Sequence, residues 1–208
     1  IDNRHTDASK IPDVWLTAAK TNVTLHYAHT SHGSQLLDGA AAWGSYNSKF
    51  NLAVSVSDQS AQLPSQTSPP RLRVYDGTLC IIDGSGTYAY PECYWYSQCG
   101  IDSTNDIINT GLFTASMFAF CGQIGYYTSS EISEYLSVMS DFEAAHPSVK
   151  FIYMTGHVTD DTEGYLRSTL IANNTQIRNY CINNNKILYD FEKIGSISPS
   201  GTSYQSTA

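Results

Sequence analysis

Short apolar segments alternate along the chain with longer segments whose apolar positions recur every three or four residues. The short segments are rich in β-branched and aromatic residues, a composition typical of buried strands. They predict strands at residues 23–28, 79–82, 112–120, 149–154 and 186–190.

The longer segments have the periodicity of amphipathic helices. The strongest signal is at residues 128–142, where Thr128 and Glu131 form a capping box ahead of an apolar stripe. The same reasoning predicts helices at residues 11–20, 35–43 and 166–183, and a short one around Ile107 and Ile108. Residues 45–75 are rich in Ser, Asn, Gln and Pro and are predicted to form loops.

Apolar strands joined by helices imply a parallel sheet covered on both faces. We therefore expect an α/β fold with a mostly parallel five-stranded sheet. The 208 residues suffice for one well-buried core, so a single domain spanning residues 1–208 is expected. In such sheets ligands bind at the carboxyl ends of the strands, which makes those ends the place to look for chemistry.

The charge balance narrows the classes of partner. The chain has 11 Lys and Arg against 19 Asp and Glu, a formal net charge of -8, and no cluster of basic residues. Phosphate backbones are bound by basic patches, so a nucleic-acid partner is not expected. No apolar run approaches the roughly 20 residues that cross a bilayer, so we expect no membrane span.

None of the five cysteines has the Cys-x-x-Cys spacing of zinc sites. Cys93 and Cys99 bracket a short loop that a disulfide could close. Cys121 and Cys181 lie in apolar contexts and are predicted to be buried thiols.

Two further features bear on location. Asn22 and Asn173 begin glycosylation sequons, and the sequence at Ile1 is not that of a signal peptide, as expected for a processed chain if the protein is exported. Together with the expected disulfide, they predict a secreted or otherwise extracytoplasmic protein.

The best candidate for chemistry is the segment from His29 to Gln35, where a predicted strand gives way to a predicted helix. Ser31 lies near the helix N-terminus, whose free N–H groups attract anions, so it is the candidate nucleophile. Ser34 competes with it for that role. His29 and His32 flank Ser31 and are candidates for substrate binding or for an alternative base.

Acyl transfer also needs a base and donors for the oxyanion. His157 follows a predicted strand and is the candidate base, oriented by Asp160 or Asp161. The Gln123 amide is the candidate oxyanion donor, together with an unobstructed N–H from Gly100 or Gly84.

These residues resemble the SGNH hydrolases, also called the GDSL esterase and lipase superfamily, and in particular a little-characterised bacterial branch of it. His29-Thr30-Ser31 would correspond to the Gly-Asp-Ser block, Gly100 to the glycine of the second block, and Cys121-Gly122-Gln123 to the Gly-x-Asn block. Residues 153–157 and 188–191 add to the likeness. The superfamily's Asp-x-x-His block does not occur after Asp190.

The resemblance implies a flavodoxin-like three-layer α/β/α sandwich and a secreted serine esterase. The expected substrate is a carbohydrate or small ester, most specifically an O-acetylated carbohydrate, and the chemistry needs no cofactor.

Two other functions remain open. A non-catalytic carbohydrate-binding or assembly protein would use the aromatic residues between positions 88 and 96 for stacking, and self-association would be compatible with it. A metal could bind His26, His29, His32 and His157. Strand geometry, however, turns His26 and His29 to opposite faces, and no neighbouring carboxylate or Cys is expected to complete a ligand set, so no bound metal is expected.

Overall fold

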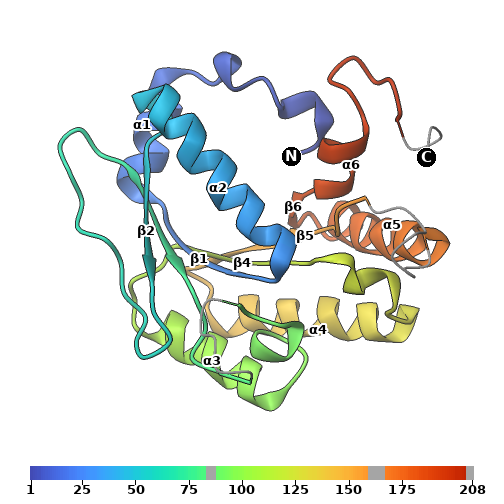
Figure 1. The fold of residues 1–208 in the computed structure, drawn as a ribbon. Coiled ribbons are helices and arrows are strands. Elements are labelled where there is room, and N and C mark those ends of the chain that lie inside the picture. Colours follow the sequence, from blue (N-terminus) through green and yellow to red (C-terminus); the bar gives the residue numbers. More distant parts are fainter. Residues whose placement is uncertain (83–87, 159–166, 205–208) are drawn as a thin grey trace.

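The computed structural model describes residues 1–82, 88–158 and 167–204 (Figure 1). Its strands are β1 (Thr24–His29), β2 (Leu52–Val56), β3 (Leu72–Asp76), β4 (Ala115–Ala119), β5 (Lys150–Met154) and β6 (Ile187–Tyr189). They form one sheet in the order β2-β3-β1-β4-β5-β6, in which every neighbouring pair is parallel. Without β2 this is the strand order of flavodoxin-like sheets.

Helices cover both faces of this sheet, which confirms the three-layer α/β/α fold. On one face lie α1 (Asp13–Asn22) and α2 (Ser31–Tyr46), and on the other lie α3 (Gln98–Asn109) and α4 (Ser129–Ala145) (Figure 1). Helix α5 (Arg167–Asn183) packs beside α4, and α6 (Phe191–Ser196) follows β6. Short 3-10 helices occupy Asn3–His5, Ala8–Lys10, Ser48–Phe50, Pro91–Cys93 and Gly122–Gly125.

The sheet has six strands rather than the expected five, because β2 and nearly all of β3 lie in the stretch predicted to be loops, whereas the strand predicted at residues 79–82 is absent. Neither strand offers a continuous apolar run: Arg73 interrupts β3, and Ser55 interrupts β2, which is only partly buried. This side of the sheet therefore has a weaker sequence signal than the central strands.

The strand predicted at residues 79–82 is wrong. The N–H of Leu79 donates to Ser103 Oγ and that of Cys80 to Thr78 Oγ1, so side chains satisfy the backbone where a neighbouring strand would. Leu79 and Cys80 pack inward, whereas Ile81 and Ile82 are 41% and 56% exposed. The segment is an apolar loop on the core.

The capping box at the start of α4 is confirmed. Thr128 Oγ1 accepts from the N–H of Glu131, whose carboxylate accepts from the N–H of Thr128. These bonds hold the pKa of Glu131 below its ordinary value. Helix α2 begins at Ser31, earlier than the predicted residue 35.

Alternate residues of the central strands face different cores. On β1, Ala28 packs into the large core under α3, α4 and α5, whereas Tyr27 packs into a smaller core beneath α2. On β4, Phe118 packs into the large core and Met117 into the smaller one. Burial on both faces explains why these strands read as almost continuous apolar runs.

The disulfide joins Cys80 to Cys99, with an S–S distance of 2.03 Å, so the expected pairing of Cys93 with Cys99 is wrong. Cys93 is buried in the turn that precedes α3 and takes no part in this disulfide. Cys181 is buried as predicted, and burial raises the pKa of its thiol to about 12. Cys121 is only half-buried.

Other surface features follow from the same packing. The amide of Asn173 is buried and donates to Ile124 O and Tyr127 O, so this sequon is closed to glycosylation in the folded chain. Asn22, at the end of α1, is exposed. Within the described residues, no helix combines the length and apolar character needed to cross a membrane.

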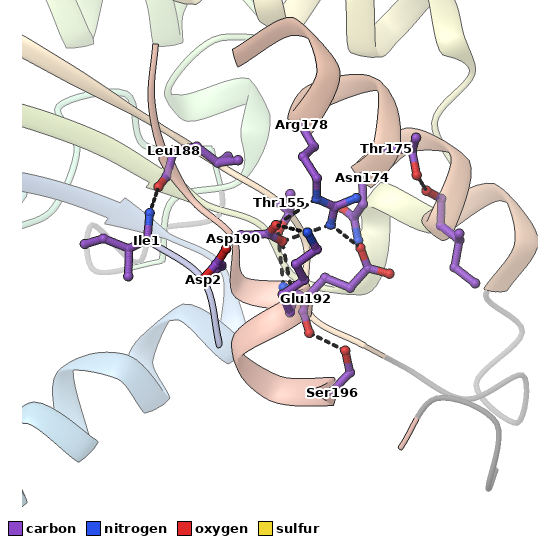
Figure 2. A network of polar contacts seen from close by, with 12 residues as sticks. Ile1, Asp2, Thr155, Asn174, Thr175, Arg178, Leu188, Asp190, Glu192 and Ser196 are labelled. Atoms are coloured by element: carbon purple, nitrogen blue, oxygen red, sulfur yellow. Dashed lines mark hydrogen bonds and ion pairs between the residues drawn. The ribbon is translucent and has the colours of Figure 1, made fainter. Parts of the chain in front are cut away.

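The two edges of the sheet differ. Along β6, the backbone nitrogen of Ile1 donates to Leu188 O at 2.7 Å, and Ile1 O accepts from the N–H of Asp190 at 2.8 Å (Figure 2). The opposite edge is β2, where Val54 and Val56 are 37% and 50% exposed.

Candidate functional site

The carboxyl ends of β1, β4 and β5 lie next to one another in the sheet. The chain leaves β1 at Thr30, β4 at Phe120 and β5 at Thr155, so the residues that follow meet at one edge. The connections from β1 and β4 diverge here, which makes this edge the switch point where α/β sheets bind ligands.

Ser31 is the first residue of α2 and is exposed. Its neighbour Thr30 occupies the N-cap position without a side-chain capping bond, so the hydroxyl of Thr30 does not occupy the first N–H groups of the helix. Ser34 Oγ donates to Ser31 O at 2.8 Å, an ordinary bond within a helix. Ser31 is therefore the better-placed hydroxyl for attack on a ligand.

Gly33 allows the start of α2 to approach the sheet. A Cβ on Gly33 would lie 2.3 Å from His29 Cβ, closer than real side chains come, and 3.0 Å from Ala119 Cβ, which is a tight contact. The glycine therefore sets the distance between the first turn of α2 and the ends of β1 and β4.

Gln123 brings an amide to the same turn. Its Nε2 donates to Thr30 Oγ1 at 3.1 Å, next to Ser31 in the chain. An amide nitrogen carries two hydrogens, so the second remains for a ligand.

His157 has a defined tautomer. Its Nδ1 lies 2.6 Å from Val158 O, and since a carbonyl only accepts, Nδ1 carries the proton. Nε2 is therefore the nitrogen with a lone pair, and it is buried without a hydrogen-bond partner among the described residues. The ring stacks on that of His32 with centroids 3.9 Å apart.

The backbone before His157 is held on both sides. The Gly156 N–H donates to Asn174 Oδ1 at 2.8 Å, and Asn174 Nδ2 donates to Gly156 O at 3.3 Å. A Cβ on Gly156 would lie 2.4 Å from a methyl carbon of Ile124, so only glycine fits there without a shift. These contacts fix the direction in which the chain delivers His157.

A buried ionic network supports the residue before that glycine (Figure 2). Thr155 Oγ1 donates to Asp190 Oδ1 at 3.2 Å and accepts from the N–H of Glu192 at 3.1 Å. Arg178 binds both oxygens of Asp190, at 2.7 and 2.9 Å, and Glu192 at 2.7 Å. The network therefore ties the end of β5 to α5 and to the start of α6.

Cys121 joins the site from β4. Its Sγ lies 2.7 Å from His32 Nδ1. Ligand atoms of His32, Cys121 and His157 all lie within 4.8 Å of one another. The expectation that no cysteine would complete a histidine set at this edge is thus wrong, and Cys121 is the residue that sequence reasoning missed.

His29 and His26 do not join this cluster. His29 Nδ1 lies 3.1 Å from Thr30 O, and its Nε2 lies 3.1 Å from Asp76 Oδ1. That second pair is close but is not aligned as a hydrogen bond. His26 is fully buried in the large-core face of β1.

Gly100 serves a different purpose from the one predicted. Its N–H donates to Ser97 Oγ at 3.2 Å, the capping bond of α3, so it is not free to bind an oxyanion. A Cβ there would lie 2.4 Å from Glu92 O, which shows that the glycine packs α3 against the preceding turn. Gly84, Asp160 and Asp161 lie outside the described residues.

Aromatic side chains adjoin the site. The N–H of Ala89 donates to His29 O at 2.9 Å, which brings residues 88–90 to the end of β1. The rings of Tyr88 and Tyr90 lie 4.9 Å apart, and Tyr90 is 37% exposed.

No protein-family model, curated protein or solved structure matches this chain. The function is therefore argued from the site itself.

Proposed function

We propose that the protein is a serine ester hydrolase of the SGNH type, with Ser31 as nucleophile and His157 as base. The observation that carries the proposal is the tautomer of His157: its Nδ1–H is bound by Val158 O, which leaves the Nε2 lone pair buried and unpaired among the described residues. The ring lies against His32, the residue after Ser31. A general base needs such an unprotonated nitrogen beside the nucleophile.

In this mechanism Ser31 Oγ attacks the ester carbonyl while His157 Nε2 takes the hydroxyl proton. The same proton then passes to the leaving alcohol, and water repeats the cycle on the acyl-enzyme. The N-terminal N–H groups of α2 and the second hydrogen of the Gln123 amide would bind the oxyanion. Among the described residues, Val158 O would orient the imidazole of His157. Asp160 remains a predicted contributor to that orientation.

The proposed substrate is an O-acetylated carbohydrate. Tyr88 and Tyr90 supply aromatic surface at the end of β1, where a sugar ring could stack beside Ser31. The Cys80–Cys99 disulfide supports an extracytoplasmic location, since disulfides persist in oxidising compartments.

A serine-reactive fluorophosphonate probe, followed by turnover of acetyl esters, tests the proposal. We expect the wild type to be labelled, and Ser31→Ala to lose labelling and more than about a thousand-fold of its turnover. Ser45→Ala is the matched control, because Ser45 lies in the same helix and its hydroxyl donates to Ala41 O within that helix. Ser34→Ala tests the competing hydroxyl.

Labelling that persists in Ser31→Ala would overturn the nucleophile assignment. A wild type that is not labelled but binds acetylated polysaccharide would favour the non-catalytic carbohydrate-binding alternative. The aromatic pair of Tyr88 and Tyr90 is the feature of the site that this alternative would use.

A further inference from the structure

We propose that His32, Cys121 and His157 form a binding site for a thiophilic divalent metal of the Zn²⁺ class, with a fourth position open. The three residues follow three adjacent strands of the sheet, and their ligand atoms lie within 4.8 Å of one another. This inference stands whether or not Ser31 is a nucleophile.

The residue types select the metal. Imidazole nitrogen and thiolate sulfur are ligands of Zn²⁺, Co²⁺ and copper, whereas Ca²⁺ and Mg²⁺ require oxygen. No carboxylate belongs to the cluster among the described residues. A set of three protein ligands leaves the fourth tetrahedral position to water or substrate, as in catalytic zinc sites.

His157 supplies the second observation. Its Nε2 is a buried nitrogen with a lone pair and no partner in the described chain. Metal-ligating histidines donate their other ring N–H to a carboxylate or backbone carbonyl, which is the bond that Nδ1 makes to Val158 O. A metal ion would complete the bonding of this ring.

The distances require only local adjustment. Zinc bonds of about 2.1 Å to nitrogen and 2.3 Å to sulfur place two tetrahedral ligand atoms roughly 3.5 Å apart. His32 Nδ1 and Cys121 Sγ, at 2.7 Å, would separate by somewhat under an ångström to admit the ion. Cys121 and His32 are both half-buried, so water and ions reach the cluster.

The fold holds His157 in place for this role. Asn174 binds both polar groups of the Gly156 peptide, and the ionic network around Asp190 binds Thr155. The backbone that carries the ligand is therefore fixed before an ion arrives, which lowers the ordering cost of binding.

Metal binding also has a consequence for the proposed esterase, and this step rests on that proposal. A metal ion bound to His157 Nε2 would occupy the lone pair that otherwise accepts the proton of the Ser31 hydroxyl. Zn²⁺ is then expected to suppress fluorophosphonate labelling of Ser31, and a chelator is expected to restore it.

The primary test uses chelator-treated protein, equilibrium dialysis with Zn²⁺, and the absorption spectrum with Co²⁺. We expect one ion per chain, with a thiolate-to-cobalt charge-transfer band and the intense visible bands of tetrahedral Co²⁺. Cys121→Ala and His157→Gln should each weaken Zn²⁺ binding by more than about 100-fold, and Cys121→Ala should also abolish the charge-transfer band.

Two matched substitutions outside the cluster serve as controls. Cys181→Ala removes another free thiol, and His146→Gln removes a histidine that bonds to Asn105. Both are expected to bind Zn²⁺ as the wild type does, and circular dichroism would confirm that every variant is folded.

The metal site is wrong if folded wild type takes up no stoichiometric Zn²⁺, or if Cys121→Ala and His157→Gln bind as tightly as their controls. Loss of Ser31 labelling alone would not produce either result. Failure of the esterase and failure of the metal site are therefore told apart.

Discussion

At the scale of single residues, His26 and His157 show that the same side chain can be fully bonded at one position and keep a lone pair at another. His26 Nε2 lies 3.1 Å from Gly77 O, so it carries the proton, and Nδ1 accepts from Ser116 Oγ at 2.9 Å. Ser116 Oγ in turn accepts from the Tyr94 hydroxyl at 2.6 Å. Every hydrogen in this buried chain has an acceptor, so neutral His26 is fully bonded where His157 keeps a lone pair.

The burial of His26 predicts a loss of stability in acid. Desolvation lowers its pKa from 6.5 to about 4, so between these pH values the unfolded chain binds a proton that the folded chain does not. The contribution of neutral His26 to the free energy of unfolding is complete above about pH 6.5, and it falls by roughly 3 kcal/mol as the pH drops to about 4. Urea unfolding across this pH range measures the slope of the free energy of unfolding against pH.

His26→Gln should flatten that slope, because Gln does not titrate. Equal slopes in the wild type and His26→Gln would show that other groups carry the pH dependence.

The candidate site could be predicted only in part. The strand ends at Ser31, Gln123 and His157 follow from apolar periodicity, since parallel strands present their carboxyl ends at one edge. The approach of Cys121 to His32 does not, because the rotation of α2 on the sheet depends on the packing of Gly33 against His29 and Ala119. The position of Cys121 directly after β4 was the available signal.

At the scale of elements, one arginine of α5 binds the two carboxylates that follow β6, and Asp190 in turn accepts from Thr155 at the end of β5. The Arg178 side chain is 15% exposed, and the Asp190 and Glu192 side chains that it binds are 3% and 4% exposed. Removing one partner of a buried ion pair leaves an uncompensated charge in a medium of low polarity.

We expect Arg178→Met to lower the free energy of unfolding by roughly 3 to 5 kcal/mol. Lys193→Met is the control, because Lys193 Nζ lies 3.9 Å from Asp190 and its side chain is 35% exposed, so its loss should cost less than about 1 kcal/mol. Urea unfolding of the two variants makes the comparison. Equally small losses of unfolding free energy in the two variants would mean that water already stabilises the charge of Asp190.

Strand prediction succeeded for the central strands and for β6, and it failed for β2 and β3, which lie together at one side of the sheet. Strands β1, β4 and β5 are buried on both faces, and the apolar runs at their positions were predicted. β2 is half-exposed and β3 contains Arg73, so their apolar character falls below that of the loop around Cys80. The loop is apolar because it packs on the core, a tertiary contact that no local pattern contains.

At the scale of the whole molecule, the Cys80–Cys99 bond ties the connection that follows β3 to the first turn of α3. The sequence separation is 19 residues, and closing a loop of that size stabilises a fold by about 3 kcal/mol through the entropy of the unfolded chain.

Reduction should therefore lower the free energy of unfolding by about 3 kcal/mol, measured by urea unfolding with and without reductant. The double variant Cys80→Ala/Cys99→Ala should be insensitive to reductant. Cys93→Ala should keep the sensitivity, since the disulfide joins Cys80 to Cys99. Loss of sensitivity in Cys93→Ala would instead support a Cys93–Cys99 pairing.

The unequal edges of the sheet limit how copies could associate. Backbone groups of Ile1 already bond along β6, whereas β2 has no strand on its outer side in the described chain. In the part of the chain that the structure describes, β2 is therefore the more open edge for strand addition. Two copies joined β2 to β2 would bury both open edges, so growth by this route ends at a closed pair and does not continue into a fibre.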